Sequence, residues 1–575
     1  MTTIINMPNL SNERAKQEVI TRLSPPHNLL ASTIAYSTQG HLLIMGSEKA
    51  IRTAALQLSS MQSTTLLVTE SAQIDIDTAD DSEAIESLIA STKNDTVFYN
   101  KLLSVTGYLG QFDVDVSITA QEETSISRIP LAKLALGLPH FDLILDLNAS
   151  PILTTNLLPP GYFHANDTTT LASLYEQLPQ YIGDFEKPKY FQINNDMCAH
   201  SARGQTGCTR CLDVCPADAI TSIQNIISID PHLCHGAGGC SSACPTGAIT
   251  YNLPPRGQLL DYIQRLITLY SAEGGEDFCL LFHDHDKGRE LTLKHASSIK
   301  GHIIPIEVEE LASVGLEVWL ASYAMGVNTL YLLNTDAIPS SMQNLVEEQI
   351  SLAHRIMTGL AIHPDRLQLV DDITLLENPL PLQPSLPSVA PAQSFTTDKR
   401  ETLFNAIANL ADAASTTEPQ QCLNPVIPLP HGAPFGKVTI QEQECTLCLS
   451  CVAVCPASAL TAGKDSPALY FTEQNCVQCG LCERSCPEKV ITLTPQLRLH
   501  ATDQPQELIA EEAFQCISCA TPFAPKRTVE KMIKSLSEHK QFQGSAINRL
   551  KMCADCRVRD IYNDLTLHPE KQLEL

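Results

Sequence analysis

Two stretches of cysteines with identical spacing constrain this chain more than any other feature of its sequence. Each reads C-x2-C-x2-C-x3-C-P, and the two begin at Cys445 and Cys476. Three thiolates this close together can each bind one iron of a cubane, and the fourth cysteine is carried by a helix toward the neighbouring cluster. The spacing therefore predicts two [4Fe-4S] clusters that exchange one ligand.

This exchange assigns a ligand set to each cluster. One set is Cys445, Cys448, Cys451 and Cys486, and the other is Cys476, Cys479, Cys482 and Cys455. Residues 433–497, which contain both sets, resemble the 2[4Fe-4S] bacterial ferredoxins. Gly480, next to a ligand, suits a tight loop because glycine adopts conformations closed to other residues. A zinc site is the weaker alternative, since zinc motifs pair their cysteines in twos.

A second cysteine-rich region, residues 185–255, repeats this design with an irregular start. The position expected for the first cysteine holds Gln205, whereas Cys198 lies further upstream. The polar segment between Cys198 and Cys208 can loop out and return Cys198 as the missing ligand. The alternative is that Cys198 is a free thiol. The exchange rule then predicts a third [4Fe-4S] cluster. Its ligands are Cys198, Cys208, Cys211 and Cys244.

The other site of this region lacks a fourth cysteine, because Ala237 occupies the corresponding position. The ligands that remain are Cys234, Cys240 and Cys215. The resemblance to ferredoxins implies a [3Fe-4S] cluster, since ferredoxins that carry one commonly depart from cysteine at this position. A [4Fe-4S] cluster completed by His235 or water, and a site without a cluster, are the alternatives. The retained cysteines and Pro245 argue against a decayed site.

The C-terminal region, residues 498–575, pairs its cysteines in two separate C-x2-C motifs. The motifs are Cys516 with Cys519, and Cys553 with Cys556. Tetrahedral zinc is bound by pairs of this kind, so we predict a structural zinc site; a further iron–sulfur cluster and free thiols are the alternatives. The three regions account for nineteen of the 21 cysteines, and Cys279 and Cys422 stand alone.

The segments between the cysteine regions have the hydrophobic pattern of α/β domains. Residues 1–184 begin with a buried strand, a helix and a second strand, which predicts a mixed-sheet domain. Residues 256–377 alternate apolar runs with helical stretches, which predicts a small parallel sheet of the doubly wound type. Residues 378–432 are proline-rich and are predicted to form a linker with a helix. The chain is thus predicted to combine α/β domains with two ferredoxin-like α+β modules.

Composition narrows the function of such a chain. Its 575 residues exceed what one hydrophobic core organises. The formal net charge of -26 argues against a nucleic-acid partner. It favours encounter with basic protein surfaces, and the alternative is that it only keeps the protein soluble. No stretch is long and apolar enough to cross a bilayer, and the first residues lack the pattern of a secretory signal. We therefore expect a cytoplasmic protein whose cysteines bind metal.

The order of the segments resembles that of large cytoplasmic iron–sulfur proteins that accompany formate dehydrogenases in bacteria. The resemblance is carried by DMCAHSARGQTGCTRCLDVCPADAI, CHGAGGCSSACPTGAI, VGLEVWLASYAMGV, FQCISCATPF and KMCADCRVRD. It implies redox protein partners, with formate dehydrogenase among them.

Four candidate clusters in two pairs favour the relay of single electrons between oxidoreductase partners. The sequence therefore predicts an electron carrier or an electron-transfer subunit, with ligand cysteines as its functional residues and no acid–base catalyst. A redox-sensing or assembly protein that uses its clusters structurally is the alternative hypothesis. An enzyme subunit with a flavin in an α/β domain is a third, although the sequence contains no flavin fingerprint.

Overall fold

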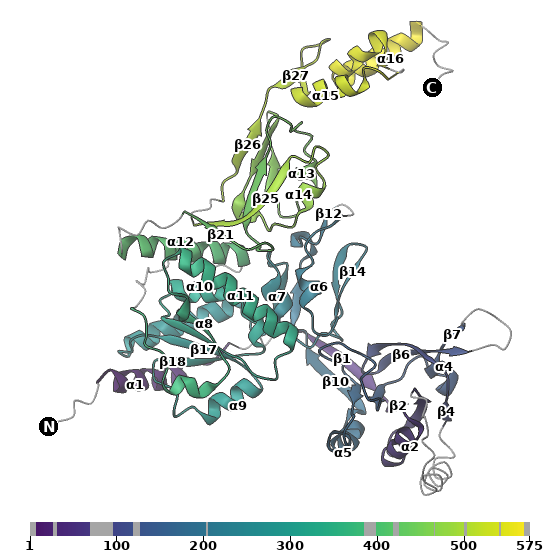
Figure 1. Cartoon of the computed structure of the whole chain (residues 1–575), viewed down its shortest axis with the longest axis vertical. Helices are drawn as coiled ribbons and strands as arrows, with labels where there is room; N and C mark the ends of the chain where they lie inside the picture. The colour runs from purple at the N-terminus through teal and green to yellow at the C-terminus, as the bar shows by residue number, and fades with distance from the viewer. Residues whose placement is uncertain are drawn as a thin grey trace.

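The computed structural model of this chain is a mixed α/β protein with several separate sheets, as the sequence predicts. The described ranges are residues 7–26, 32–69, 96–118, 127–202, 205–384, 398–417, 425–464, 466–499, 503–539 and 542–567. Figure 1 shows the N-terminal sheets at one end of the molecule and helices α15 (Lys526–Leu536) and α16 (Ala554–Leu567) at the other. Within these ranges, we find no helix with the length and apolar character needed to span a bilayer.

A parallel five-stranded sheet forms the first unit of the chain. Its strands follow the order β4 (Thr96–Phe98), β3 (Ser63–Val68), β2 (His41–Gly46), β8 (Leu143–Asp146) and β9 (Tyr162–His164). Helix α2 (Glu48–Gln57) connects β2 to β3, in agreement with the predicted strand, helix and strand. Leu42 and Ile44 of β2 lie in one apolar cluster, and Leu43 and Met45 lie in another. Both faces of the central strand are therefore covered.

Antiparallel strands extend this unit toward the first cysteine region. Strands β5 (Leu102–Tyr108), β6 (Gln111–Ile118) and β7 (Ser127–Pro130) form a meander, followed by α4 (Leu131–Leu136). Helix α5 (Thr168–Gln177) begins after Asp167, whose carboxylate accepts hydrogen bonds from the backbone N–H groups of Thr169 and Thr170. Strand β1 (Thr33–Thr38) then pairs with β10 (Gly183–Pro188).

A second parallel sheet forms the centre of the molecule. Its strands follow the order β18 (Ile303–Val308), β17 (Cys279–Asp284), β19 (Thr329–Leu333) and β20 (Leu367–Val370). Alternate residues of β17 enter different apolar clusters, with Leu280 and Phe282 on one face and Cys279 and Leu281 on the other. The helices of this unit are α8 (Arg256–Ala272), α9 (Lys287–Lys294), α10 (Leu316–Ala324) and α11 (Ser340–Gly359). Helix α1 (Met7–Arg22) packs against α8.

The two cysteine-rich segments share one order of elements. In the first, β11 (Phe191–Ile193) pairs with β16 (Ile249–Tyr251), and β14 (Ile220–Ile223) pairs with β15 (Ile226–Ile229). In the second, β22 (Gly436–Ile440) pairs with β25 (Ile491–Arg498), and β23 (Leu460–Ala462) pairs with β24 (Ala468–Phe471). One short helix precedes each proline of the motifs: α6 (Arg210–Val214), α7 (Gly239–Ala243), α13 (Ser450–Ala453) and α14 (Leu481–Arg484). Strand β26 (Gln506–Ala510) extends the second segment beyond β24.

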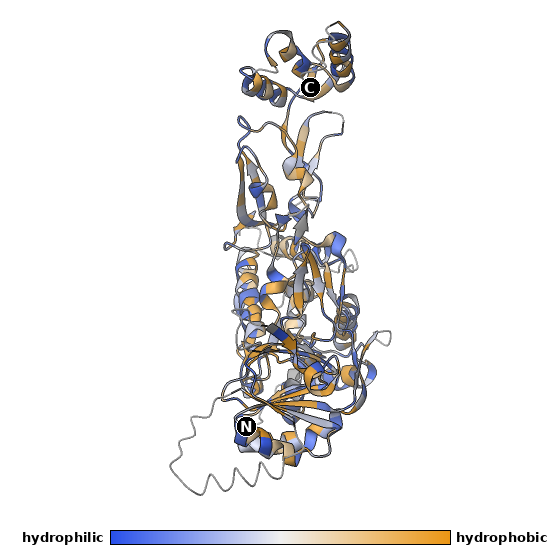
Figure 2. Ribbon diagram, turned by 90° about the vertical axis from the view of Figure 1, so that its right-hand side faces the viewer, coloured by the Kyte–Doolittle hydropathy of each residue, from blue (hydrophilic) through white to orange (hydrophobic). Residues whose placement is uncertain are grey.

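The helix expected within the proline-rich stretch is α12 (Lys399–Thr417), which packs along α10. Residues 385–397 and 418–424, with the isolated Cys422, lie outside the described ranges. Strand β21 (Val426–Pro428) follows and pairs with β25. Phe404 of α12, Trp319 of α10 and Ile427 of β21 belong to the same apolar cluster. This core therefore extends from the central sheet into the second cysteine segment, and Figure 2 shows the apolar residues along these helices and strands.

Three charged side chains are buried where α8, α10 and α12 meet. A carboxylate oxygen of Glu317 lies 3.2 Å from Arg256 Nε, and the other lies 3.6 Å from Lys399 Nζ. The exposed fractions of these side chains are 5%, 12% and 7%, respectively. Taking such charges out of water costs several kcal/mol per ion, of order 5. Glu317 is thus the counter-charge on which both cations depend.

We expect Glu317→Ala to lower the free energy of unfolding by about 3–5 kcal/mol, because it leaves two buried cations without their carboxylate. Urea denaturation followed by circular dichroism measures this change. Asp336→Ala is the matched control, since the ion pair of Asp336 with Lys287 is exposed and should contribute little to stability. Equal effects of the two substitutions would contradict the prediction.

Candidate metal centres

The regular cysteine motifs form two loops with the same backbone shape. Two residues after the first cysteine of each loop, Leu447 and Gln478 have φ of 52° and 53°. Two residues further on, Leu449 and Gly480 have φ of 59° and 78°. These left-handed residues curl the backbone around the cysteines, and the Leu447 N–H donates to Cys445 Sγ at 3.5 Å. Both loops thus direct thiols and backbone N–H groups toward one centre.

The thiols of these two loops gather in two groups. We number the thiol groups of the protein along the chain of neighbouring sites, and these two are site 3 and site 4. The pKa of Cys451 is raised to about 12, first by burial and then by the neighbouring thiols of Cys445, Cys448 and Cys486. Burial also raises the pKa of Cys482, with further contributions from Cys476, Cys479 and Cys455. Site 4 therefore contains Cys445, Cys448, Cys451 and Cys486, and site 3 contains Cys455, Cys476, Cys479 and Cys482. Each group draws one thiol from the other motif.

The four cysteines of site 3 line one small, partly open cavity. Its volume is about 20 Å³. Val438, Leu460 and Leu493 supply apolar walls, which keep water away from the thiols. Burial raises the pKa of Cys476 to about 11, so this thiol requires a cation nearby to bind as the thiolate. Iron would supply that charge.

The loop around Ala237 has the backbone shape of the two regular loops. Gly236 and Gly238 have φ of 84° and 76°, at the positions held by Leu447 and Leu449 in site 4. Ala237 therefore stands where Cys448 stands in the regular loop. The residue two positions after each motif proline is also left-handed throughout: Asp218, Gly247, Ser458 and Lys489. The irregular segment thus retains the loop conformation of the regular one.

Cys198 lies with the cysteines that the sequence assigns to it, in a group that we call site 2. A short hairpin of β12 (Ser201–Ala202) and β13 (Gln205–Thr206) takes up the extra residues, and the Cys208 N–H donates to Ala199 O at 3.0 Å. The His200 ring holds this loop through contacts with Cys208 O at 2.8 Å and Ser222 Oγ at 2.7 Å. The pKa of Cys211 is raised to about 12, first by burial and then by the neighbouring thiols of Cys244, Cys208 and Cys198.

The three-cysteine group, which we call site 1, contains Cys215, Cys234 and Cys240. Burial raises the pKa of Cys240 well above its usual value, and the other two thiols add to this effect. Ala237 is 9% exposed and belongs to the apolar core. His235 Nε2 is buried and makes no hydrogen bond within the described residues, while the ring is held by the Leu158 backbone. Both a three-iron cluster and ligation by His235 remain compatible with these contacts.

The four groups follow one another in the order of their numbers. Cys211 and Cys244 of site 2 act electrostatically on Cys240 of site 1, and Cys451 of site 4 acts on Cys482 of site 3. The two cysteine segments meet between sites 2 and 3, where the thiol of Cys208 helps to raise the pKa of Cys479. The neighbouring elements α14 and β12 face one another in Figure 1.

Direct contacts hold this junction between the two segments. Arg484 Nη2 donates to Thr206 O at 2.6 Å, and Ser485 Oγ donates to Gln205 Oε1 at 2.8 Å. A Cβ at Gly207 would lie 2.9 Å from the Leu481 side chain, so the close approach requires glycine. Sequence reasoning missed this contact, because the cysteine spacing does not indicate which residues between the cysteines meet the other segment.

Cys516, Cys519, Cys553 and Cys556 form a fifth group, which we call site 5. All four Sγ atoms lie within 4.8 Å of one another, and those of Cys519 and Cys553 are 3.7 Å apart. Four thiolates around one zinc at a Zn–S distance of about 2.3 Å have Sγ atoms about 3.8 Å apart, whereas a cubane holds its thiolates on separate irons and further apart. No other group of three His, Cys, Asp or Glu side chains in the described ranges converges so tightly. Site 5 therefore fits a single tetrahedral ion.

Site 5 is built by β27 (Ala513–Gln515), β28 (Pro522–Pro525) and the segments that flank α15 and α16. Burial raises the pKa of Cys516, but hydrogen bonds from the backbone N–H groups of Cys553, Cys519 and Ser518 outweigh it and lower the pKa to about 6. This favours the thiolate form that binds metal. Helix α15 also contacts site 4, since Thr528 donates to Thr446 O and Lys531 pairs with Glu488.

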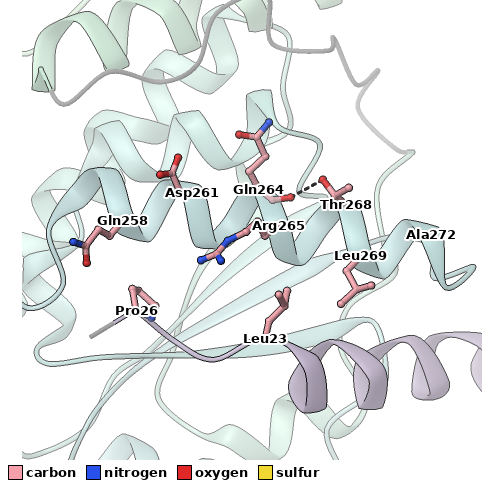
Figure 3. A pocket seen from close by; sticks show the side chains of 9 residues that line it. All are labelled: Leu23, Pro26, Gln258, Asp261, Gln264, Arg265, Thr268, Leu269 and Ala272. Atoms are coloured by element: carbon pink, nitrogen blue, oxygen red, sulfur yellow. Dashed lines mark hydrogen bonds between the residues drawn. The ribbon is translucent and has the colours of Figure 1, made fainter. Parts of the chain in front are cut away.

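A groove on the described surface lies away from these thiols. It occupies about 960 Å³ between α8 and the residues that follow α1, and no cysteine lines it. Figure 3 shows that the Thr268 hydroxyl, on its wall, donates to the Gln264 backbone oxygen of the same helix. This groove therefore contributes nothing to the metal centres.

Comparison with known proteins identifies one of the two cysteine-rich segments. Residues 444–491 match the family described as 4Fe-4S dicluster domain. This match contains all eight cysteines of sites 3 and 4 and confirms an iron–sulfur domain in the regular segment. A search of curated proteins finds no match to the chain.

We expect Cys553→Ser to remove one zinc per chain and to leave the iron content unchanged, because site 5 loses a ligand of its tetrahedral ion. Elemental analysis of purified protein measures both metals. The control is Cys279→Ser, which replaces a buried thiol outside all five sites. A fall in iron instead of zinc in Cys553→Ser would contradict the prediction.

Proposed function

We propose that this chain is a multi-cluster electron-transfer protein that relays single electrons between redox partners. The observation that carries this proposal is the consecutive order of four thiol groups, two of which lie in a 4Fe-4S dicluster domain. Iron–sulfur clusters bound there would accept and release one electron at a time. The cysteines hold the clusters, and the apolar walls exclude water from them.

The proposed cofactors follow the thiol groups. Sites 2, 3 and 4 each offer four thiols for a [4Fe-4S] cluster, and site 5 offers four for zinc. Site 1 offers three, which fits a [3Fe-4S] cluster, or a [4Fe-4S] cluster with His235 as the fourth ligand. The unpartnered Nε2 of His235 supports the second choice, whereas the apolar packing of Ala237 supports the first. We place the irregular dicluster module at residues 185–255 and the regular one at residues 433–497.

Three features support an irregular module of the same kind. Its loop around Ala237 has the left-handed residues of the regular loops. Its pairs of strands and its short helices follow the regular order. Its thiols also accept hydrogen bonds from the backbone N–H two residues further on. Arg210 donates to Cys208 and Gly236 donates to Cys234, as Leu447 donates to Cys445 in the regular module.

The remaining segments are proposed to support and connect the modules. We propose α/β domains at residues 1–184 and 256–377, a linker with a helix at 378–432 and a C-terminal zinc-binding domain at 498–575. The acidic charge of -26 suits partners with basic docking surfaces. Formate dehydrogenase is the partner we propose, on the resemblance stated from the sequence.

We expect Cys479→Ser to abolish the signal of site 3 and to leave those of sites 1 and 2, because the two modules bind their clusters through separate thiols. Electron paramagnetic resonance on anaerobically purified protein, oxidised and then reduced with dithionite, measures these signals. Iron and sulfide are quantified on the same samples, with Cys279→Ser as the control. Loss of every signal in Cys479→Ser would contradict independent modules, and wild-type clusters that cannot be reduced reversibly would contradict the relay.

We expect Ala237→Cys to replace the near-isotropic signal of an oxidised [3Fe-4S] cluster with a signal seen only after reduction, because the new thiolate can bind a fourth iron. The same spectroscopy measures this change. His235→Leu tests the alternative. If the wild-type site already shows a reduced-state signal that His235→Leu removes, then His235 is the fourth ligand and site 1 holds no three-iron cluster.

A further inference from the structure

Arg400, the second residue of α12, lies between the two cysteine segments and contacts both. Its guanidinium donates to Pro245 O at 3.3 Å, directly after Cys244 of site 2. It also donates to Cys476 O at 3.0 Å and to Gln474 O at 2.5 Å, within and beside site 3. A fourth contact, with Pro434 O, measures 3.3 Å. One side chain therefore joins the backbones that carry a ligand of each site.

Two aromatic rings hold the guanidinium in this place. Its central carbon lies 5.3 Å from the ring centre of Phe404, one turn further along α12, and 5.4 Å from that of Phe435. The two rings lie 6.0 Å apart at an interplanar angle of 88°, and both belong to the apolar core. These contacts stabilise a cation and limit its movement. The position of the charge is thus set by the core.

The hydrogen bonds of Arg400 end on four neutral backbone oxygens. The acidic residue that acts on it electrostatically is Asp398, two positions earlier in the chain. The neighbouring Lys399 differs, because Glu317 lies 3.6 Å from its Nζ. Arg400 carries a guanidinium, which stays charged at neutral pH. Its Nη2 donates to the backbone oxygen of Cys476, a cysteine of site 3, at 3.0 Å.

We propose that Arg400 is the fixed counter-charge of site 3 and a positioning residue for the junction with site 2. This inference rests on the proposed function, since it requires a cluster in site 3. A cluster becomes more negative when it gains an electron, so a fixed cation beside it stabilises the reduced form and raises the reduction potential. Its hydrogen bonds to both segments keep that cation beside the junction.

The test is a redox titration of site 3 in the full-length protein, with electron paramagnetic resonance as the readout. The signal of site 3 is identified by its loss in Cys479→Ser. We expect Arg400→Gln to lower the midpoint potential of this signal with the iron content unchanged. Arg400→Lys should keep most of the wild-type potential, because it keeps the charge. Lys437→Gln is the control, since Lys437 is an exposed cation of the same segment and water screens its charge.

A wild-type potential in iron-replete Arg400→Gln would overturn the proposal and leave Arg400 a packing residue. If Arg400→Gln loses iron, Arg400→Lys decides instead: it keeps the cation, so a lowered potential in Arg400→Lys at full iron content overturns the proposal. The proposed relay fails in a different way, through wild-type protein that binds no clusters or cannot be reduced. The two failures are therefore distinguishable in the same titration.

Discussion

Each dicluster site depends on a thiol that comes from a distant turn of the chain. Cys486 closes the group begun by Cys445, and Cys455 closes the group begun by Cys476. Neither group is complete until both loops and their short helices have folded together. The same exchange brings Cys244 to site 2 and Cys215 to site 1. Because buried thiolates require a cation, metal binding and folding of these segments are coupled.

The spacing between the two cysteine segments depends on apolar packing and not on their own motifs. The core beneath α10 and α12 continues into β21 and β25, so both segments rest on one packed interior. Gly207 permits the close approach of Leu481, and the ends of α14 and β13 bond across the gap. A row of redox sites requires fixed distances more than any particular sequence at the junction. The α/β units supply that rigidity.

Cysteine spacing predicted the regular segment, and the match of residues 444–491 to a 4Fe-4S dicluster domain confirms it. The exchanged ligands and the role of Cys198 as a ligand stay predictions from how thiolates surround a cluster. Strands such as β17 and β19 were predicted because continuous apolar runs leave few alternatives. The position of α12 was not predictable, since the prolines before it indicate a linker and Arg400 binds only backbone oxygens. A sequence does not indicate which backbone oxygens a side chain binds. The residues that carry these oxygens also lie far from residue 400 along the chain.

The left-handed residues of the loops have a consequence for how the centres are built. In site 4, Leu447 and Leu449 adopt a backbone conformation that side chains disfavour, at a cost of about 1–3 kcal/mol each, which other interactions must offset. In site 1 the same positions are glycines, for which this conformation is ordinary. The loop around Ala237 can therefore take this shape without the backbone cost that the leucines of site 4 carry.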